Sequence, residues 1–368
     1  MTSHATGDAA AFSQALEQVC KVPPRRTSVP ILSEVCVSFD GVLCTLTGTD
    51  LDTWLIRKLP ASGEAFSFVL CRTREAAKVC RLLEGPLTLE LNDTGEGKLR
   101  QLTVCISCGG RKMEFDAMDS ADYPHYGSFE VETTFSANAA ALRKRVARVG
   151  YAAADPSDGI RANICSVQFS GSRVYALDGQ QLACDTDETL VFPRPFMVCA
   201  EPLSYLQLFG DAMISVELGV HRGQITDGVT TVGFSLNGVD LYDVDGALPR
   251  SWQEEISFST KEFWEELSYL KKFAGNERKP YVRFDGGFLF LPTASGKCRT
   301  RIGLDGHSGI VFAFDLNKMM RAVQQFKGEP VLTMKVNNAV APILIGAAGR
   351  SDFALVCPVR LSDRLMAA

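Results

Sequence analysis

The order of helices and strands repeats three times along the 368-residue chain, and this repeat restricts the fold more than any other feature. Each copy begins with an amphipathic helix, expected at residues 11–22, 136–153 and 260–274. A strand, a Gly-containing turn and a second strand follow. The turns are Phe39-Asp40-Gly41, Phe169-Ser170-Gly171 and Phe284-Asp285-Gly286. Asp-Gly and Ser-Gly between alternating apolar runs are typical of β-hairpins.

A second helix and further strands complete each copy. The second helices are expected within residues 66–83, 196–209 and 311–326, and the closing strands within 87–115, 214–241 and 331–359. Asp315 or Asn317 is placed to cap the last of these helices. The sequence therefore predicts an α+β protein of three domains, each with two helices on antiparallel strands. The predicted domains are residues 1–127, 128–249 and 250–368.

The composition is that of an ordinary globular protein, with 46% hydrophobic and 22% charged residues. No apolar run reaches the roughly 18 residues of a membrane span, and the first residues show no signal-peptide pattern, so we expect a cytoplasmic protein with no membrane partner. The twelve cysteines lie mostly in apolar runs and are interpreted as core residues. The net charge of −5 excludes a wholly basic DNA-binding domain but leaves room for a basic face.

The helix expected from Ser136 is the strongest candidate for a basic face, because it contains no acidic residue. At about 100° per residue, its four cations share one side and its apolar residues the other. The cations are Arg143, Lys144, Arg145 and Arg148. We expect further cations on the same kind of surface at Lys21, Arg25, Arg26, Arg72, Arg74, Lys78, Arg81, Lys271, Lys272, Lys318, Arg321 and Lys327. Such a surface binds phosphates without reading bases; ordinary solvated helix faces are the alternative.

Five stretches, in order and on the threefold repeat, match motifs of one family. They are RTSVPILSEV from Arg26, CTLTGTDL from Cys44, Asp122-Tyr123-Pro124, LDGQQLA from Leu177 and CPVRL from Cys357. On these residues the chain resembles the beta sliding clamp of bacterial DNA polymerase III along nearly its whole length. The resemblance implies the DNA clamp fold and a ring closed by a head-to-tail homodimer around duplex DNA, which is bound independently of sequence. It further implies a non-catalytic processivity factor that tethers the polymerase III alpha subunit, the clamp loader and other proteins with a clamp-binding motif.

The resemblance also assigns residues to sites. For the peptide-binding cleft these are Ile164, Leu177, Gly179, Gln180, Gln181, Leu182, Tyr242, Gly246, Ala247, Leu355, Val356, Cys357, Pro358, Val359, Arg360 and Leu361. Arg26 and Arg72 match DNA-contact positions, and Arg143, Lys144 and Arg148 fit by location. Met113 and Phe273 align with apolar positions of the dimer interface.

Three departures from the family pattern concern charge. Gln180-Gln181 replaces His-Arg in the cleft loop, so acidic peptide ends should bind less well. Gly246 replaces an Arg of the linker, and Ala200-Glu201 replaces a basic pair before the second helix. A seven-residue tail, SDRLMAA, follows Leu361. One hypothesis is that Leu365-Met366 folds back over the cleft, and the alternative is a frayed polar tail.

No catalytic, cofactor or metal site is expected. Cys105 and Cys108 have a metal-like spacing, but residues three apart in a strand point to opposite faces. Asp50 and Asp52 suggest paired carboxylates for magnesium, as in a metal-dependent nuclease or a polymerase subunit with its own chemistry. Solvated charges at a strand end explain them as well. The other alternative is a diverged clamp-like protein that binds peptides, or acts as a regulator, without closing a ring.

Overall fold

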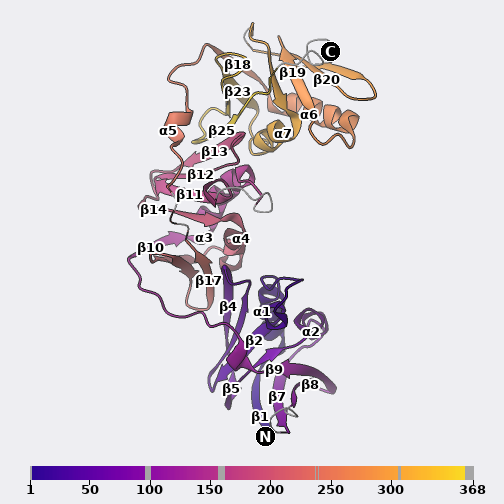
Figure 1. Cartoon of the computed structure of the whole chain (residues 1–368), viewed down its shortest axis with the longest axis vertical. Helices are drawn as coiled ribbons and strands as arrows, with labels where there is room; N and C mark the ends of the chain where they lie inside the picture. The colour runs from indigo at the N-terminus through magenta and orange to yellow at the C-terminus, as the bar shows by residue number, and fades with distance from the viewer. Residues whose placement is uncertain are drawn as a thin grey trace. The chain divides into compact units, whose positions relative to one another are not determined.

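The computed structural model describes residues 2–95, 101–155, 162–236, 238, 240–305 and 308–360. The chain divides into two compact units, Met1–Ala140 with Ser204–Leu236 and Ala141–Leu203 with Asn237–Ala368 (Figure 1). None of the helices in the described ranges is long and apolar enough to span a membrane.

The first unit is built on one antiparallel sheet, which has thirteen strands among the described residues. The hairpin expected at Phe39-Asp40-Gly41 is confirmed: Asp40 Oδ1 accepts hydrogen bonds from the backbone N of Val42 and of Leu43, at 3.0 and 2.8 Å. The strand order is β10-β15-β16-β17-β4-β3-β2-β6-β9-β8-β7-β1-β5. The strands are β1 (Thr2–Asp8), β2 (Val35–Asp40), β3 (Leu43–Thr49), β4 (Thr53–Pro60), β5 (Ser62–Gly63), β6 (Ala65–Leu70), β7 (Pro86–Thr94), β8 (Gln101–Cys108), β9 (Arg111–Met118), β10 (Thr133–Asn138), β15 (Met213–Leu218), β16 (Arg222–Thr226) and β17 (Thr230–Ser235).

Two helices pack together in the first unit, α1 (Ala9–Val19) and α2 (Thr73–Cys80). Helix α1 begins two residues earlier than expected because Asp8 caps it, its Oδ1 accepting from the backbone N of Ala11 at 2.8 Å. Its backbone lies so near β3 that a Cβ on Gly48 would approach the Val19 carbonyl oxygen to 2.7 Å. Short 3-10 turns are η1 (Pro30–Ser33), η3 (Ser120–Asp122) and η7 (Tyr205–Phe209).

The second unit contains an eight-stranded and a four-stranded antiparallel sheet within the described residues. The larger has the order β14-β11-β12-β13-β25-β24-β23-β18, and the smaller β21-β20-β19-β22. The strands are β11 (Ser166–Gly171), β12 (Arg173–Leu177), β13 (Gln181–Thr186), β14 (Phe192–Cys199), β18 (Glu254–Ser259), β19 (Tyr281–Asp285), β20 (Phe288–Pro292), β21 (Lys297–Arg301), β22 (Phe312–Asp315), β23 (Val331–Val336), β24 (Ile343–Gly346) and β25 (Asp352–Val356). The hairpins expected at residues 169–171 and 284–286 are confirmed.

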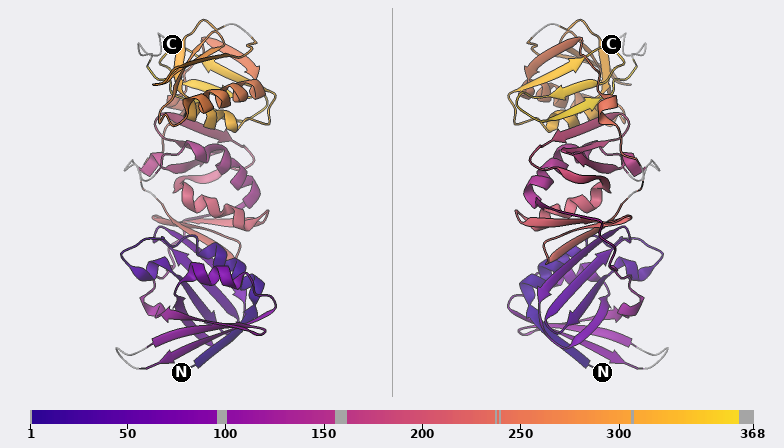
Figure 2. Two further views of the ribbon diagram at one scale, coloured as in Figure 1. Left: turned by 90° about the vertical axis from the view of Figure 1, so that its right-hand side faces the viewer. Right: turned by 90° about the vertical axis from the view of Figure 1, so that its left-hand side faces the viewer.

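Helices α6 (Thr260–Ala274) and α7 (Leu316–Gln324) lie side by side and fill the core between strands of both sheets (Figure 2). Helix α6 has the predicted bounds, and Asp315 caps α7 by accepting from the backbone N of Asn317 at 2.8 Å. The second helix of the middle copy is shorter than predicted, because α4 (Ala200–Ser204) gives way to the 3-10 turn η7. The remaining elements are α3 (Ala139–Val149), α5 (Val244–Ala247), η4 (Gly150–Ala152) and η6 (Ala162–Ile164).

Candidate functional site

The hairpin of β12 and β13 carries the loop that the sequence assigns to the peptide cleft. Asp178 closes this loop: its Oδ1 accepts from the backbone N of Gln180 at 2.8 Å and of Gln181 at 2.9 Å. Gly179 lies between them with φ of +85°, a left-handed conformation that glycine adopts without steric cost. The backbone of the loop is therefore fixed, with Gly179 and Gln180 exposed at its tip.

Strand β13 pairs with β25, which brings the C-terminal strand beside this hairpin. Leu182 pairs with Leu355, and the backbone N of Cys357 donates to the Gln180 carbonyl at 2.8 Å. Leu177, Leu182 and Leu355 are only 4, 4 and 3% exposed and pack in one apolar cluster. The cluster also includes Tyr175, Cys184 and Val244, with Ile164 and Ala247 partly buried against it. Cleft residues from five separate elements are thus brought together.

A buried glutamine joins the two flanks of this cluster. Gln168 Oε1 accepts from the backbone N of Tyr242 at 2.7 Å, and its Nε2 donates to the carbonyl of Asn163, beside Ile164, at 2.6 Å. The Tyr242 side chain itself remains exposed. A single fully buried side chain therefore positions both the η6 turn and the segment that leads into α5.

Gly246 lies inside α5, directly over the cap of that helix. Asp243 Oδ1 accepts from the backbone N of Gly246 at 3.1 Å. A Cβ at position 246 would lie 2.6 Å from Asp243 Oδ2. A cationic side chain at this position would therefore require the Asp243 cap to move.

Two of the expected cleft residues are turned away from a ligand. Val356 is fully buried in the core around α6 and α7, because alternate residues of β25 face opposite sides and Leu355 takes the cleft side. Gln181 is only 3% exposed, and its Nε2 donates to Asp178 Oδ2 at 3.1 Å. Of the two glutamines, only Gln180 is exposed. Cys357, Pro358 and Val359 are half-buried and Arg360 is exposed; Leu361 and the tail after it, including Leu365-Met366, lie outside the described residues.

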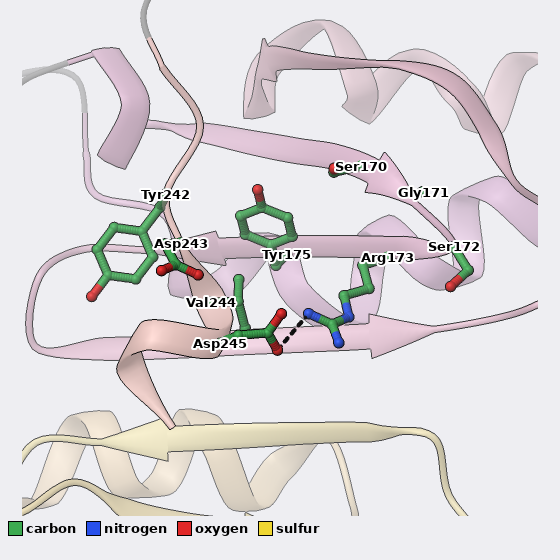
Figure 3. A pocket seen from close by; sticks show the side chains of 9 residues that line it. All are labelled: Ser170, Gly171, Ser172, Arg173, Tyr175, Tyr242, Asp243, Val244 and Asp245. Carbon is green, nitrogen blue, oxygen red and sulfur yellow. Dashed lines mark hydrogen bonds and ion pairs between the residues drawn. The ribbon is translucent and has the colours of Figure 1, made fainter. Parts of the chain in front are cut away.

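A polar pocket of about 310 Å³ adjoins the cluster and shares Tyr175 and Val244 with it (Figure 3). In the figure the Arg173 and Asp245 side chains meet across the pocket, with Nη1 and Oδ1 2.8 Å apart. The hydrogen bond that Arg173 donates to Asp245 raises the pKa of Arg173, and burial raises the pKa of Tyr175 to about 12. At neutral pH the pocket therefore holds a charged Arg173 and a protonated Tyr175 hydroxyl. Sequence reasoning missed this pocket because its two sides are 72 residues apart.

Helix α3 presents fewer cations to solvent than expected. Arg145 is 3% exposed, and its Nε lies 2.8 Å from Asp185 Oδ2. Arg148 Nη1 lies 2.7 Å from the other oxygen of the same carboxylate, and its side chain is 24% exposed. The expectation that Arg145 faces solvent is wrong, because the buried Asp185 of β13 draws it inward. Lys144 is exposed and Arg143 half-buried.

Other expected surface cations also have partners inside the protein. Arg74 donates to the carbonyls of Pro23 and Ser33, Lys271 to Asn317, and Lys318 to Asp178 of the cleft loop. Arg81 pairs with Glu17, and Lys327 lies over the ring of Trp264. Arg81 and Lys327 stay exposed in spite of these contacts, as do Lys21, Arg25, Arg26, Arg72, Lys78, Lys272 and Arg321.

The residues weighed for metal chemistry serve the fold. Asp50 Oδ1 accepts from the backbone N of Asp52 and of Thr53, at 3.0 and 2.6 Å, and so closes the turn between β3 and β4. Cys105 and Cys108 are buried free thiols on β8. Across the ranges the structure describes, no three His, Cys, Asp or Glu side chains gather to hold a metal ion.

The two residues expected at a dimer interface lie next to incompletely paired strand edges. Met113 is on β9, which pairs with β8 along its length but with β6 only at Ala117 and Met118. Phe273 is 39% exposed at the end of α6 and lies 3.6 Å from the Cβ position of Gly296, just before β21. Strand β21 ends its sheet and, in the described part of the chain, pairs with β20 alone.

Comparison with known proteins agrees with this geometry. A sequence model of the DNA polymerase III beta subunit, N-terminal domain, matches residues 8–127. The beta sliding clamp of Pseudomonas aeruginosa is 22% identical over 274 residues, which cover 72% of this chain and 73% of that protein. The resemblance of the chain to the DNA polymerase III beta-subunit family is thereby confirmed.

Solved clamps of this family share the fold. A DNA polymerase sliding clamp from Pseudomonas aeruginosa superposes with a TM-score of 0.84 at 19% identity, over 98% of this chain and 100% of that one. The sliding clamp from Bacillus subtilis superposes with a TM-score of 0.83 at 18% identity and the same coverage. The predicted α+β clamp fold is confirmed, and the relatives named as sliding clamps support a sliding-clamp function.

Proposed function

We propose that the chain acts in DNA replication as a homodimeric ring that encircles duplex DNA and tethers a polymerase by short peptides. The clamp fold, matched over nearly the whole chain, is the observation that carries this proposal. A ring holds its polymerase by topology, so its contacts with DNA stay weak and mobile. It needs no catalytic group or cofactor of its own, and its work on DNA places it in the cytoplasm.

The ring is proposed to close head to tail, between the first domain of one copy and the third domain of the next. Within the described residues, β21 pairs on one side only, and β9 has no strand partner on its second side before Ala117. These edges support the contact, because each offers backbone groups that a second copy can pair. A heterologous contact of this kind forms a ring when its rotation closes. We propose that the chain has three domains, residues 1–127, 128–249 and 250–368. The family match ends at residue 127, which supports the first boundary.

Duplex DNA is proposed to meet Arg26, Arg72, Arg143, Lys144 and Arg148. Arg26, Arg72 and Lys144 are exposed and Arg143 is half-buried, so their charges can reach phosphates. Arg148 shares its charge with Asp185 and contributes less. Contacts of this sort are independent of sequence and weaken as salt rises.

The apolar cluster around Leu177, Leu182 and Leu355 is proposed as the floor of a cleft for linear peptides. Ile164, Tyr242 and Ala247 border it, and exposed Gln180 offers neutral polar contacts. The polymerase III alpha subunit, the clamp loader and other proteins with a clamp-binding motif are the proposed ligands. They would insert apolar side chains into this cleft.

Light scattering across a dilution series tests the proposal. A native mass of twice 40.1 kDa that persists on dilution supports the ring. A mass of 40.1 kDa at every concentration would exclude it. A clamp-like peptide-binding protein that does not close a ring would then be the better account.

A further inference from the structure

We propose that Arg299 and Arg301 of β21 in one copy bind Glu114 and Asp116 of β9 in a second copy. These opposite charges on the two strands then decide which chains can form a ring together. This inference rests on the proposed head-to-tail ring and names the side chains that decide which chains enter it. Its basis is a basic edge strand in one unit and an acidic edge in the other.

The outer face of β21 carries only cations. Lys297, Arg299 and Arg301 are exposed and alternate with half-buried Cys298 and Thr300. The guanidinium carbon of Arg299 lies 3.9 Å from the ring centre of Phe288, and that of Arg301 lies 5.1 Å from it. A guanidinium stacked by its face keeps its N–H groups free in its plane for a carboxylate. Phe288 therefore holds both arginines ready for an acidic partner.

The outer face of β9 carries the complementary charge. Glu114 and Asp116 are exposed, and neither forms an ion pair within the described residues. Lys112 lies on the same face, and although burial raises the pKa of the Cys105 thiol on the neighbouring strand, the charge of Lys112 acts to lower it. Two carboxylates against one lysine make this face of β9 net acidic.

If β21 of one copy pairs with β9 of the next, the alternation of side chains places the arginines of β21 and the carboxylates of β9 on the same face of the resulting sheet. Met113 and Phe115 are half-buried on the opposite face of β9. On β21, Thr300 donates to Glu266 of α6, so the inner face of this strand is toward that helix. If the apolar faces of the two strands join, their charged residues must share the other face, because side chains alternate with a period of two. Opposite charges across paired strands stabilise the pair and like charges destabilise it.

The test uses two reversed-charge variants of the full chain, Glu114→Lys/Asp116→Lys and Arg299→Glu/Arg301→Glu. Each alone places like charges at both contacts of a ring, so its dimer dissociation constant should rise about 100-fold. Mixed in equal amounts, the two variants meet with opposite charges at both contacts. The mixture should form a heterodimer as tight as the wild-type dimer. Sedimentation velocity, with one variant labelled, measures both results.

A matched control separates the edge contact from net charge. Asp211→Lys/Glu265→Lys makes the same charge change as Glu114→Lys/Asp116→Lys, at exposed positions outside both strands, and should leave the dimer unchanged. Circular dichroism melts check that each variant is folded. If each reversed variant dimerises like the wild type, or if the mixed variants stay monomeric, the charge polarity is refuted while the ring stands. A wild-type chain that is itself monomeric refutes the proposed ring instead.

Discussion

The proposed peptide cleft and the arginines of α3 lie in the same unit, yet the residues that the sequence singles out behave in opposite ways in the two places. In the cleft, Leu177, Leu182 and Leu355 converge on one apolar cluster as expected. On α3, Arg145 turns inward to Asp185 instead of facing solvent. Apolar residues gather because burial itself stabilises the fold, whereas the direction of a charge depends on where its partner lies.

The largest effect should come from removing the partner of the inward arginines. Asp185→Asn leaves the buried Arg145 without its counter-ion, and breaking a buried pair costs roughly 3–5 kcal/mol of unfolding free energy. Urea denaturation followed by circular dichroism measures this change. The matched control is Asp245→Asn, which breaks the more exposed pair with Arg173 and should cost less than about 1 kcal/mol. Equal losses of unfolding free energy in the two variants would contradict the predicted difference between the buried and the exposed ion pair.

The outward cations of α3 should matter for DNA and little for stability. Arg143→Ala/Lys144→Ala removes two phosphate contacts, so the slope of log K against log salt should fall by about 2. Fluorescence anisotropy with a linear duplex at several salt concentrations measures the slope. Arg148→Ala should change it less, because Arg148 is bound to Asp185. An unchanged slope in the double variant would show that Arg143 and Lys144 of α3 do not contact DNA phosphates.

Most of the fold follows from sequence patterns, because hairpin turns and helix caps act locally. Asp40-Gly41, Asp315 and the full length of α6 are where the sequence places them. Contacts between residues far apart in the sequence could not be predicted from local patterns. The pairing of β13 with β25 is of this kind, and so is the burial of Arg145 by a residue 40 positions away. The family resemblance placed both segments in one cleft without predicting that their strands pair, and no local pattern around Arg145 indicated its burial.

In the cleft, Tyr242→Ala should weaken peptide binding about 10-fold, because an exposed aromatic side chain at a binding surface is lost. Its free energy of unfolding should change by less than about 0.5 kcal/mol, since only the backbone of Tyr242 bonds to Gln168. Titration of a labelled clamp-binding peptide gives the affinity, and Val191→Ala is the exposed control. An unchanged peptide affinity in Tyr242→Ala would show that the bound peptide does not contact the Tyr242 side chain.

The smallest effect concerns the two glutamines of the cleft loop. Gln180→Arg restores a cation at an exposed position and should tighten binding of an acidic peptide by about 0.2–1 kcal/mol, a gain that high salt removes. Gln181→Arg should instead lower stability, because Gln181 is buried. Peptide titrations at low and high salt, together with urea denaturation, distinguish the two positions. A gain of affinity at position 181 without loss of stability would contradict its inward placement.

The central claim is that the chain closes around DNA, and topology tests it most directly. Chains diluted to monomers are brought together in the presence of nicked circular plasmid and passed through a sizing column at high salt. The account predicts that protein elutes with the circle and is released when the plasmid is cut to a linear form. Protein that leaves the circle at high salt before any cut, or that stays on the linear form, would contradict it.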